Sequence, residues 1–233
     1  MDLGKFVKTL PVLYDDLKAP SFPKDRKLRH ITERKYGMTT ENIGFLLNYG
    51  LSLMGPGEVY VEVGTWKGGS LSYAMEGNVG KEFCAFDNFT WFTKRAPWWR
   101  PWSYPEPKHS LMKVLKHYSE RYKVVFQEGD FRDTLPGLDR SIGVYYFDDG
   151  HSFNDQLDGL NIVVDKMAEE SLIVVDDTNP EYEGSEARAA NEKWLREHPE
   201  WTLLFDLQSP KPCHEGWWCG VQVLGRYRTR QGV

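Results

Sequence analysis

Short apolar runs alternate with longer segments of helical periodicity along most of the chain. Seven apolar runs have the length and residue types of strands, and they occupy residues 59–63, 83–86, 123–127, 142–147, 172–175, 201–207 and 217–224. Between them, apolar residues recur every three or four positions, which predicts helices at residues 39–54, 70–75, 111–121, 154–168 and 185–197. The first of these helices has an N-cap candidate in Thr39 or Thr40 and stops at Gly55-Pro56-Gly57.

The order of these elements predicts an α/β fold. Strands that alternate with helices form a parallel sheet with helices on both faces. The last two runs have no helix between them, so we expect an antiparallel final strand pair at one edge of a seven-stranded, mostly parallel sheet. A chain of 233 residues suits one domain. We place this domain at residues 39–233, after an N-terminal appendage at 1–38 that contains a short helix near 5–18.

Composition excludes several classes of protein. The net charge of −5 argues against nucleic acid as a partner, because a nucleic-acid binder usually has a basic face. Three cysteines are too few for a disulfide framework and predict a cytoplasmic protein. No apolar run approaches the roughly 20 residues of a membrane span, and the N-terminal sequence is not typical of a secretory signal. A homo-oligomer is left open.

Acidic residues follow five consecutive predicted strands. In an open parallel sheet, ligands bind beyond the carboxyl ends of the strands. The polar residues at these ends are Glu62 with Gly64, Asp87, Asp130, Asp148 with His151, and Asp176 with Asp177. Single acids are common turn or capping residues, but five at one edge would repel one another. A cation or a hydroxyl-rich ligand is therefore expected among them.

The turn after the first strand contains the glycines that a ligand-binding turn requires. Gly64 and Gly68 let the backbone approach a ligand, and Thr65 and Ser70 lie beside the free N–H groups that begin the next helix. The turn has neither the phosphate-binding Gly-Lys-Ser/Thr sequence nor a regular Gly-x-Gly-x-x-Gly spacing, so an ordinary strand-to-helix turn is equally compatible with it.

Two acids further along extend the interpretation of this turn. Asp87 follows it by about 20 residues, the spacing at which an acid accepts hydrogen bonds from ribose hydroxyls. Asp130 ends the third strand in a Gly-Asp pair and is assigned, more weakly, to an adenine amino group. A simple turn residue is the alternative for both.

A second group of acids has the composition of a metal site. Asp148, Asp176 and Asp177 end two strands that we expect to be neighbours, and carboxylates are suitable ligands for Mg²⁺ or another divalent cation. Helix capping is the alternative for one or two of them. His151 follows Asp148 by three residues, where an imidazole can act as a general base. Cys213, His214 and Cys219 offer only three zinc ligands and make a weak metal motif.

Three motifs resemble the class I S-adenosylmethionine-dependent O-methyltransferases, and most closely the branch of small-molecule, macrolide-sugar and cephalosporin-hydroxylase-like proteins. They are VYVEVGTWKGGS at 59–70, YFDDGHSF at 146–153 and IVVDDT at 173–178. The resemblance runs from about residue 39 to 225 and implies a Rossmann-like fold. It also implies a catalytic domain in which Glu62, Gly64, Thr65, Gly68, Ser70, Asp87, Asp130 and Asp148 bind the cofactor. Asp148, Asp176 and Asp177 would hold the metal, and His151 and Asp148 would be catalytic.

The family's usual second loop is replaced by a Trp-rich insertion at 88–107. Its aromatic and basic side chains could stack on an acceptor or meet its acidic groups, or they could pack the loop onto the domain. The residues assigned to the substrate are Trp91, Arg95, Trp98, Trp99, Arg100 and Trp102. We expect the methyl acceptor to be a small-molecule or glycan hydroxyl, above all on a sugar or glycoconjugate. A phenol or catechol acceptor, an iron-dependent relative, a non-catalytic binding protein and an RNA methyltransferase are the alternatives.

Overall fold

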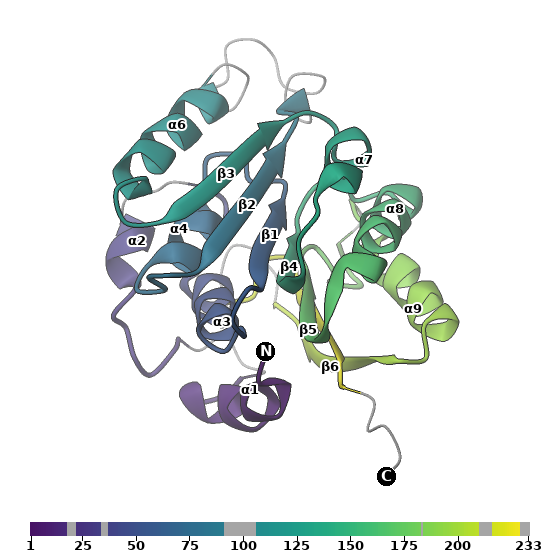
Figure 1. Cartoon of the computed structure of the whole chain (residues 1–233). Helices are drawn as coiled ribbons and strands as arrows, with labels where there is room; N and C mark the ends of the chain where they lie inside the picture. The colour runs from purple at the N-terminus through teal and green to yellow at the C-terminus, as the bar shows by residue number, and fades with distance from the viewer. Residues whose placement is uncertain (18–21, 34–36, 91–105, 183, 210–215, 229–233) are drawn as a thin grey trace.

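The computed structural model describes residues 1–17, 22–33, 37–90, 106–182, 184–209 and 216–228. One seven-stranded sheet runs through it in the order β3-β2-β1-β4-β5-β7-β6 (Figure 1). The strands are β1 Val59–Val63, β2 Glu82–Asp87, β3 Lys123–Glu128, β4 Ile142–Phe147, β5 Met167–Val175, β6 Trp201–Leu207 and β7 Val221–Arg226. Strands β1 to β5 pair in parallel, and β7 is antiparallel to both β5 and β6. The predicted fold is confirmed.

Helices cover both faces of the sheet (Figure 1). They are α1 Leu3–Thr9, α2 Arg29–Glu33, α3 Glu41–Ser52, α4 Gly69–Met75, α6 Glu106–Tyr118, α7 Phe131–Thr134, α8 Phe153–Val163 and α9 Ala187–Glu197. One apolar cluster joins α1, α3, α4 and α6 to the sheet, and a second joins α7, α8 and α9 to its other face. No helix in the described part of the chain is long and apolar enough to cross a membrane.

Several predicted elements have the wrong boundaries. The helix predicted at 154–168 ends at Val163, and after a short 3-10 turn β5 begins at Met167 instead of residue 172. The strand predicted at 217–224 begins only at Val221. Cys219 and Gly220 have φ angles of 60° and 87°, and a left-handed backbone cannot continue a strand.

The N-terminal segment packs onto the rest of the chain. Its predicted helix at 5–18 is shorter, since α1 ends at Thr9. Leu3 and Phe6 of α1 are fully buried in the same apolar cluster as α3. The indole of Trp217 packs on Tyr14, with ring centroids 5.4 Å apart, and donates a hydrogen bond to the Leu17 carbonyl at 2.9 Å. The division at residue 38 stays a prediction, but this segment shares one core with the sheet.

Candidate functional site

A cavity of about 530 Å³ lies at the carboxyl ends of the central strands. Its wall includes eight residues that the sequence predicts for the site: Gly64, Thr65, Ser70, Asp87, Asp148, His151, Asp176 and Asp177. They follow the ends of β1, β2, β4 and β5, which are consecutive strands of the sheet in the order β2-β1-β4-β5. Parallel strands thus bring residues from 64 to 177 to one edge, as expected for an open α/β sheet.

The turn after β1 requires glycine at position 64. Gly64 has a φ of +87°, and a Cβ atom there would lie 1.8 Å from the Asp148 carbonyl oxygen. The close approach is held by hydrogen bonds from the Gly64 N–H to the Phe86 carbonyl at 3.0 Å and from the Asp148 N–H to the Val63 carbonyl at 2.9 Å. The turns after β1 and β4 therefore contact each other through backbone, which leaves room for a ligand above them.

Glu62 is a fully buried carboxylate beneath this turn. The Ser70 hydroxyl donates to its Oε1 at 3.0 Å, and the Tyr60 hydroxyl donates to its Oε2 at 2.5 Å. Burial raises the pKa of Glu62 from 4.5 to about 7, although the two hydroxyls oppose the shift. Ser70 and Thr65 line the cavity, whereas Glu62 lies behind them. Gly68 caps α4 and packs on α6, away from the cavity wall.

Asp87 is anchored by two backbone N–H groups at the cavity wall. Its Oδ2 accepts from Trp66 at 2.5 Å and its Oδ1 from Phe89 at 2.6 Å. Burial raises the pKa of Asp87, and the two N–H groups oppose that shift. The carboxylate is fixed in place, and each oxygen keeps a further lone pair for a ligand hydroxyl.

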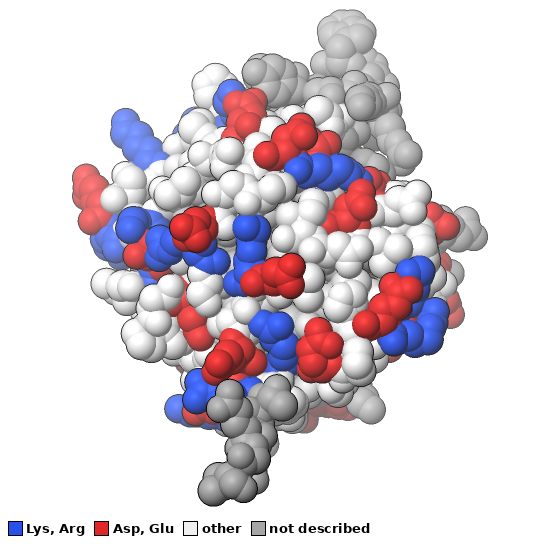
Figure 2. Space-filling view, turned by 45° about the vertical axis from the view of Figure 1, so that its right-hand side comes forward, with Lys and Arg blue, Asp and Glu red and all other residues white. Residues whose placement is uncertain are grey.

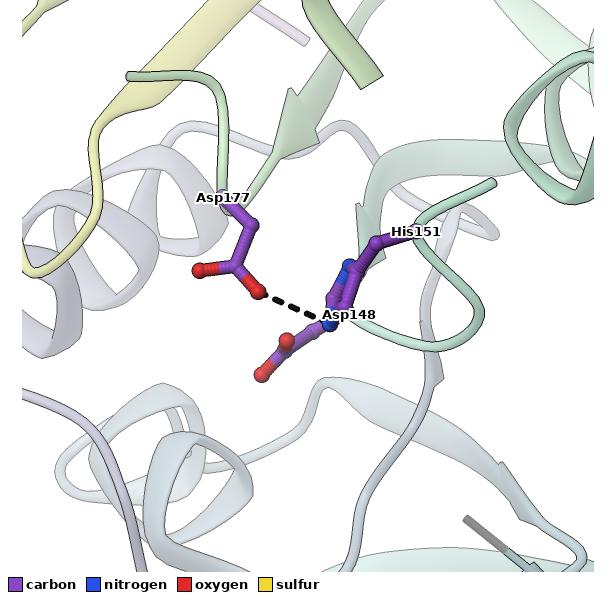
Figure 3. Close-up of side chains that lie close together, drawn as sticks. All are labelled: Asp148, His151 and Asp177. Carbon is purple, nitrogen blue, oxygen red and sulfur yellow. Dashed lines mark ion pairs between the residues drawn. The ribbon is translucent and has the colours of Figure 1, made fainter. Parts of the chain in front are cut away.

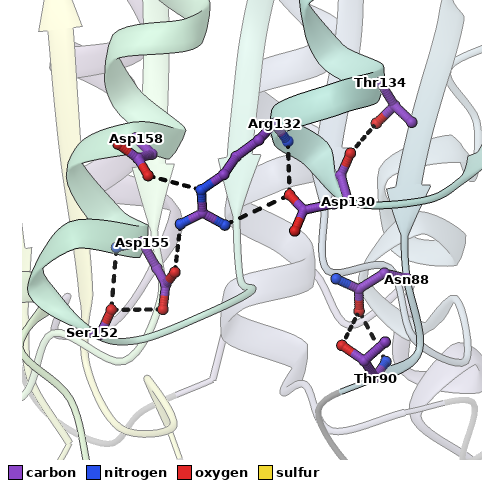
Figure 4. A network of polar contacts seen from close by, with 8 residues as sticks. All are labelled: Asn88, Thr90, Asp130, Arg132, Thr134, Ser152, Asp155 and Asp158. Carbon is purple, nitrogen blue, oxygen red and sulfur yellow. Dashed lines mark hydrogen bonds and ion pairs between the residues drawn. The ribbon is translucent and has the colours of Figure 1, made fainter.

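Asp130 is used differently from the prediction. It caps α7, where its Oδ1 accepts from the Arg132 N–H at 2.9 Å (Figure 4). The same oxygen lies 3.6 Å from the Arg132 guanidinium, which also pairs with Asp155 at 2.5 Å and Asp158 at 2.8 Å. Asp130 is not one of the described residues that line the cavity. Its predicted contact with adenine stays untested. In the structure Asp130 caps α7 and pairs with Arg132 of the same helix, and Arg132 in turn pairs with two acids of α8.

Three side chains converge as a candidate metal site: Asp148, His151 and Asp177 (Figure 3). One ligand atom from each lies within 4.8 Å of the others, and His151 Nε2 is 2.8 Å from Asp177 Oδ2. Asp176 lines the same cavity, but its Oδ2 accepts from the Tyr146 hydroxyl at 2.6 Å and its Oδ1 from the Asp177 N–H at 3.0 Å. The carboxylates of Asp148 and Asp177 suit a divalent cation, so they fit the predicted metal, and the imidazole beside them is left for the predicted base.

The acids of this group raise one another's pKa. Burial and the neighbouring Asp176 and Asp177 raise the pKa of Asp148 well above its usual range, and burial and Asp177 do the same to Asp176. Burial lowers the pKa of His151, but the carboxylates around it, above all Asp177, outweigh this effect and raise it. A cation in the cluster would relieve this repulsion.

Other residues of the cavity wall were not predicted from the sequence. Met38 from the N-terminal segment, Tyr182 after β5 and Trp218 before β7 all line it, as does Asp149. Asp149 has a pKa raised to about 6, first by burial and then by the charge of Asp87. Its position beside Asp148 at a strand end was the available signal.

The six residues assigned to the substrate lie outside the described residues, as do Cys213 and His214 of the weak zinc motif. The substrate residues are Trp91, Arg95, Trp98, Trp99, Arg100 and Trp102. Their role stays a prediction.

Comparison with known proteins gives a family match and several structural matches. Residues 61–178 match the family described as "Methyltransferase domain", a span that begins within β1 and includes the strand ends from Gly64 to Asp177. A search of curated protein sequences finds no match.

The solved structures with a similar fold include three methyltransferases. The O-methyltransferase TomG from Streptomyces achromogenes, in complex with SAM, has a TM-score of 0.58 and 15% identity over 88% of this chain and 92% of that chain. The O-methyltransferase from Bacillus cereus, in complex with SAH, has a TM-score of 0.60 and 12% identity over 88% and 92%. SAH-bound PaMTH1 from Podospora anserina has a TM-score of 0.58 and 15% identity over 88% of each chain. At these identities the likeness shows the shared fold.

Proposed function

Since this chain belongs to the methyltransferase-domain family, we propose that it transfers the methyl group of S-adenosylmethionine to a hydroxyl of a sugar or glycoconjugate, assisted by a divalent cation. The family match agrees with the methyltransferase predicted from the motifs at 59–70, 146–153 and 173–178. The observation that carries the proposal is the convergence of Asp148, His151 and Asp177 on the same cavity as the Gly64 turn and Asp87.

The cavity has the features that the cofactor requires. Gly64 lets the turns after β1 and β4 meet through backbone, because a Cβ atom there would clash with the Asp148 carbonyl oxygen. Asp87 presents a fixed carboxylate to a ribose, and the buried Glu62 places a second acid beneath the expected methionine portion. When bound, S-adenosylmethionine supplies a methyl group on a sulfonium, whose departure as a thioether makes the transfer favourable.

The chain's own residues would prepare the acceptor. We assign Asp148 and Asp177 to the cation, and Asp176 remains the third predicted ligand because a hydrogen-bonded carboxylate oxygen can still coordinate a metal. A bound divalent cation lowers the pKa of a hydroxyl and fixes its oxygen. His151 then takes the hydroxyl proton, and Asp177, 2.8 Å away, stabilises the imidazolium that forms.

One face of the molecule offers no broad positive patch to a nucleic acid among its described residues. On the face shown in Figure 2, acidic and basic side chains are interspersed and neither sign gathers into a broad patch. A phosphate backbone would require a concentrated positive surface.

A phenol or catechol acceptor is the second candidate, and the cavity wall is the observation that favours it. Met38, Phe89, Tyr182 and Trp218 give this wall apolar and aromatic surface. Such surface stacks on a planar aromatic ring.

One assay tests the proposal and separates the two acceptors. Release of S-adenosylhomocysteine is measured with panels of glycans and of catechols, in Mg²⁺ and in EDTA. We expect turnover with a glycan that stops in EDTA and returns with Mg²⁺. Turnover with catechols alone would favour the second candidate, and full activity in EDTA would contradict the metal assignment.

A further inference from the structure

Tyr146 is a fully buried tyrosine of β4 whose hydroxyl lies against two acids of the candidate metal site. Its ring belongs to the apolar cluster that joins α3 and α4 to the sheet. A buried hydroxyl needs a hydrogen-bond partner. This one lies 2.6 Å from Oδ2 of Asp176 and 3.3 Å from Oδ2 of Asp148. Tyr146 has no role in the mechanism proposed above.

The sheet brings these three side chains to one face. Alternate residues of a strand point to the same face, so Asp148, which follows β4, continues the face of Tyr146. Tyr146 pairs with Val174 of β5, and Asp176 lies two residues beyond Val174. The Asp176 N–H donates to the Phe147 carbonyl at 3.1 Å, which extends the β4–β5 pairing to this acid. Such a diagonal between neighbouring strands is within reach of an aromatic side chain.

The Tyr146 hydroxyl has one proton and donates it to one acceptor at a time. The 2.6 Å contact is therefore the donated bond, and a bond to a carboxylate is the stronger kind. Asp148, at 3.3 Å, is the second acceptor within reach of the same hydroxyl. Tyr146 thus ties together the acids that follow β4 and β5.

Asp176 extends this constraint to the rest of the site. Its Oδ1 accepts from the Asp177 N–H at 3.0 Å. Asp177 has a φ of 56°, an uncommon conformation for a residue with a side chain, and the bond to its N–H helps to fix the direction of its carboxylate. Oδ2 of Asp177 in turn lies 2.8 Å from Nε2 of His151 (Figure 3). One hydroxyl is therefore connected to all three predicted metal ligands.

We propose that Tyr146 is a positioning residue for the divalent cation: its hydroxyl aims the carboxylates of Asp148 and Asp176, and through Asp176 that of Asp177, at one point. The inference rests on the metal of the proposed function. Tyr146 is not one of the described residues that line the cavity, so it acts through the acids. Hydrogen bonds behind metal ligands fix their orientation, and the loss of one typically weakens metal binding about 10- to 100-fold.

The preceding residue, Tyr145, provides a matched control. It is also fully buried, and its hydroxyl donates to the Gly159 carbonyl at 3.1 Å. It points to the opposite face of β4 and belongs to the second apolar cluster, with α8. Tyr145→Phe and Tyr146→Phe each remove one buried hydroxyl from the same strand, but only the second removes it from the acids.

The test measures Mn²⁺ binding without cofactor, from the electron paramagnetic resonance signal of free Mn²⁺. We expect Tyr146→Phe to raise the Kd for Mn²⁺ about tenfold or more, while Tyr145→Phe leaves it unchanged. Both variants should bind S-adenosylhomocysteine like the wild type in calorimetry without metal, because neither tyrosine is among the described residues of the cavity wall. Replacement of Tyr146 by 4-aminophenylalanine restores a donor and should restore Mn²⁺ binding, which preserves the test if Tyr146→Phe does not fold.

Unchanged Mn²⁺ affinity in Tyr146→Phe, or an equal loss in both phenylalanine variants, would overturn the inference. A folded 4-aminophenylalanine variant that binds Mn²⁺ no better than Tyr146→Phe would do the same. Absence of Mn²⁺ binding by the wild type would overturn it together with the metal assignment. Failure of the wild type to bind S-adenosylhomocysteine while Mn²⁺ still binds would instead refute the proposed methyl transfer and leave the inference standing.

Discussion

Glu62→Gln should make the protein's stability less dependent on pH. The wild-type carboxyl is fully buried, and its pKa rises from 4.5 to about 7. Below pH 4.5 both the folded and unfolded chains hold this proton. Between pH 4.5 and 7 the unfolded chain loses the proton while the folded chain keeps it, so the free energy of unfolding falls as pH rises. Above pH 7 the loss is complete, and a shift of this size amounts to about 3 kcal/mol.

Glutamine has the shape of the carboxyl but does not ionise. Its amide can still bond both Tyr60 and Ser70, since a hydroxyl can accept as well as donate. Urea denaturation followed by tryptophan fluorescence gives the free energy of unfolding of both proteins from pH 4.5 to 8.5. Relative to the wild type, the free energy of unfolding of the variant should rise by about 3 kcal/mol between the two ends of this pH range. Parallel pH profiles would refute the reasoning, because they would mean that Glu62 ionises equally easily in both states.

Three further tests concern the turn after β1, the base, and the segment between His151 and α8. Gly64→Ala should abolish S-adenosylhomocysteine binding in calorimetry. Gly57→Ala is the control: its φ is also positive, at +78°, but a Cβ atom there meets nothing within 4 Å, so it should cost only about 1–2 kcal/mol of backbone strain and leave binding intact. Equal binding by the two variants would contradict the steric argument. His151→Ala should lower the methyl-transfer rate roughly 100-fold or more with nearly unchanged cofactor affinity, and a normal rate would remove it as the base. The Glu186 carboxylate accepts from the Phe153 N–H at 3.1 Å, two residues after His151, and so positions the segment that carries the base. Glu186→Ala should therefore lower kcat without raising the KM for the cofactor. Glu186→Gln should restore kcat, and failure of that rescue would count against a positioning role.

Much of the fold follows from local pattern. Strands β1, β4 and β6 have the predicted bounds, because each is an apolar run between polar or turn residues. The strand predicted from residue 217 begins too early because the apolar side chain of Trp217 does not belong to a strand. It packs on Tyr14, 203 positions away along the chain. The helix predicted to 168 was too long because Val163, Val164 and Met167 continue the helical period into β5.

The candidate site was predictable where topology alone decides it. Gly64, Asp87, Asp148 and Asp177 meet because parallel strands end at one edge of the sheet. The position of Met38, Tyr182 and Trp218 depends on how separate loops pack, and no local pattern specifies it. Asp130 shows the opposite limit, since its spacing suited a ligand contact while its local capping geometry engaged it with Arg132.

A crystal structure with S-adenosylhomocysteine and Mn²⁺ would test the central claim most directly, with anomalous scattering to locate the metal. We predict that the ribose hydroxyls bond Asp87, that the methionine portion lies over Gly64, and that a Mn²⁺ peak lies within coordination distance of Asp148 and Asp177. A nucleoside bound outside this cavity, or an ordered cofactor in it with no metal at these carboxylates, would contradict the account.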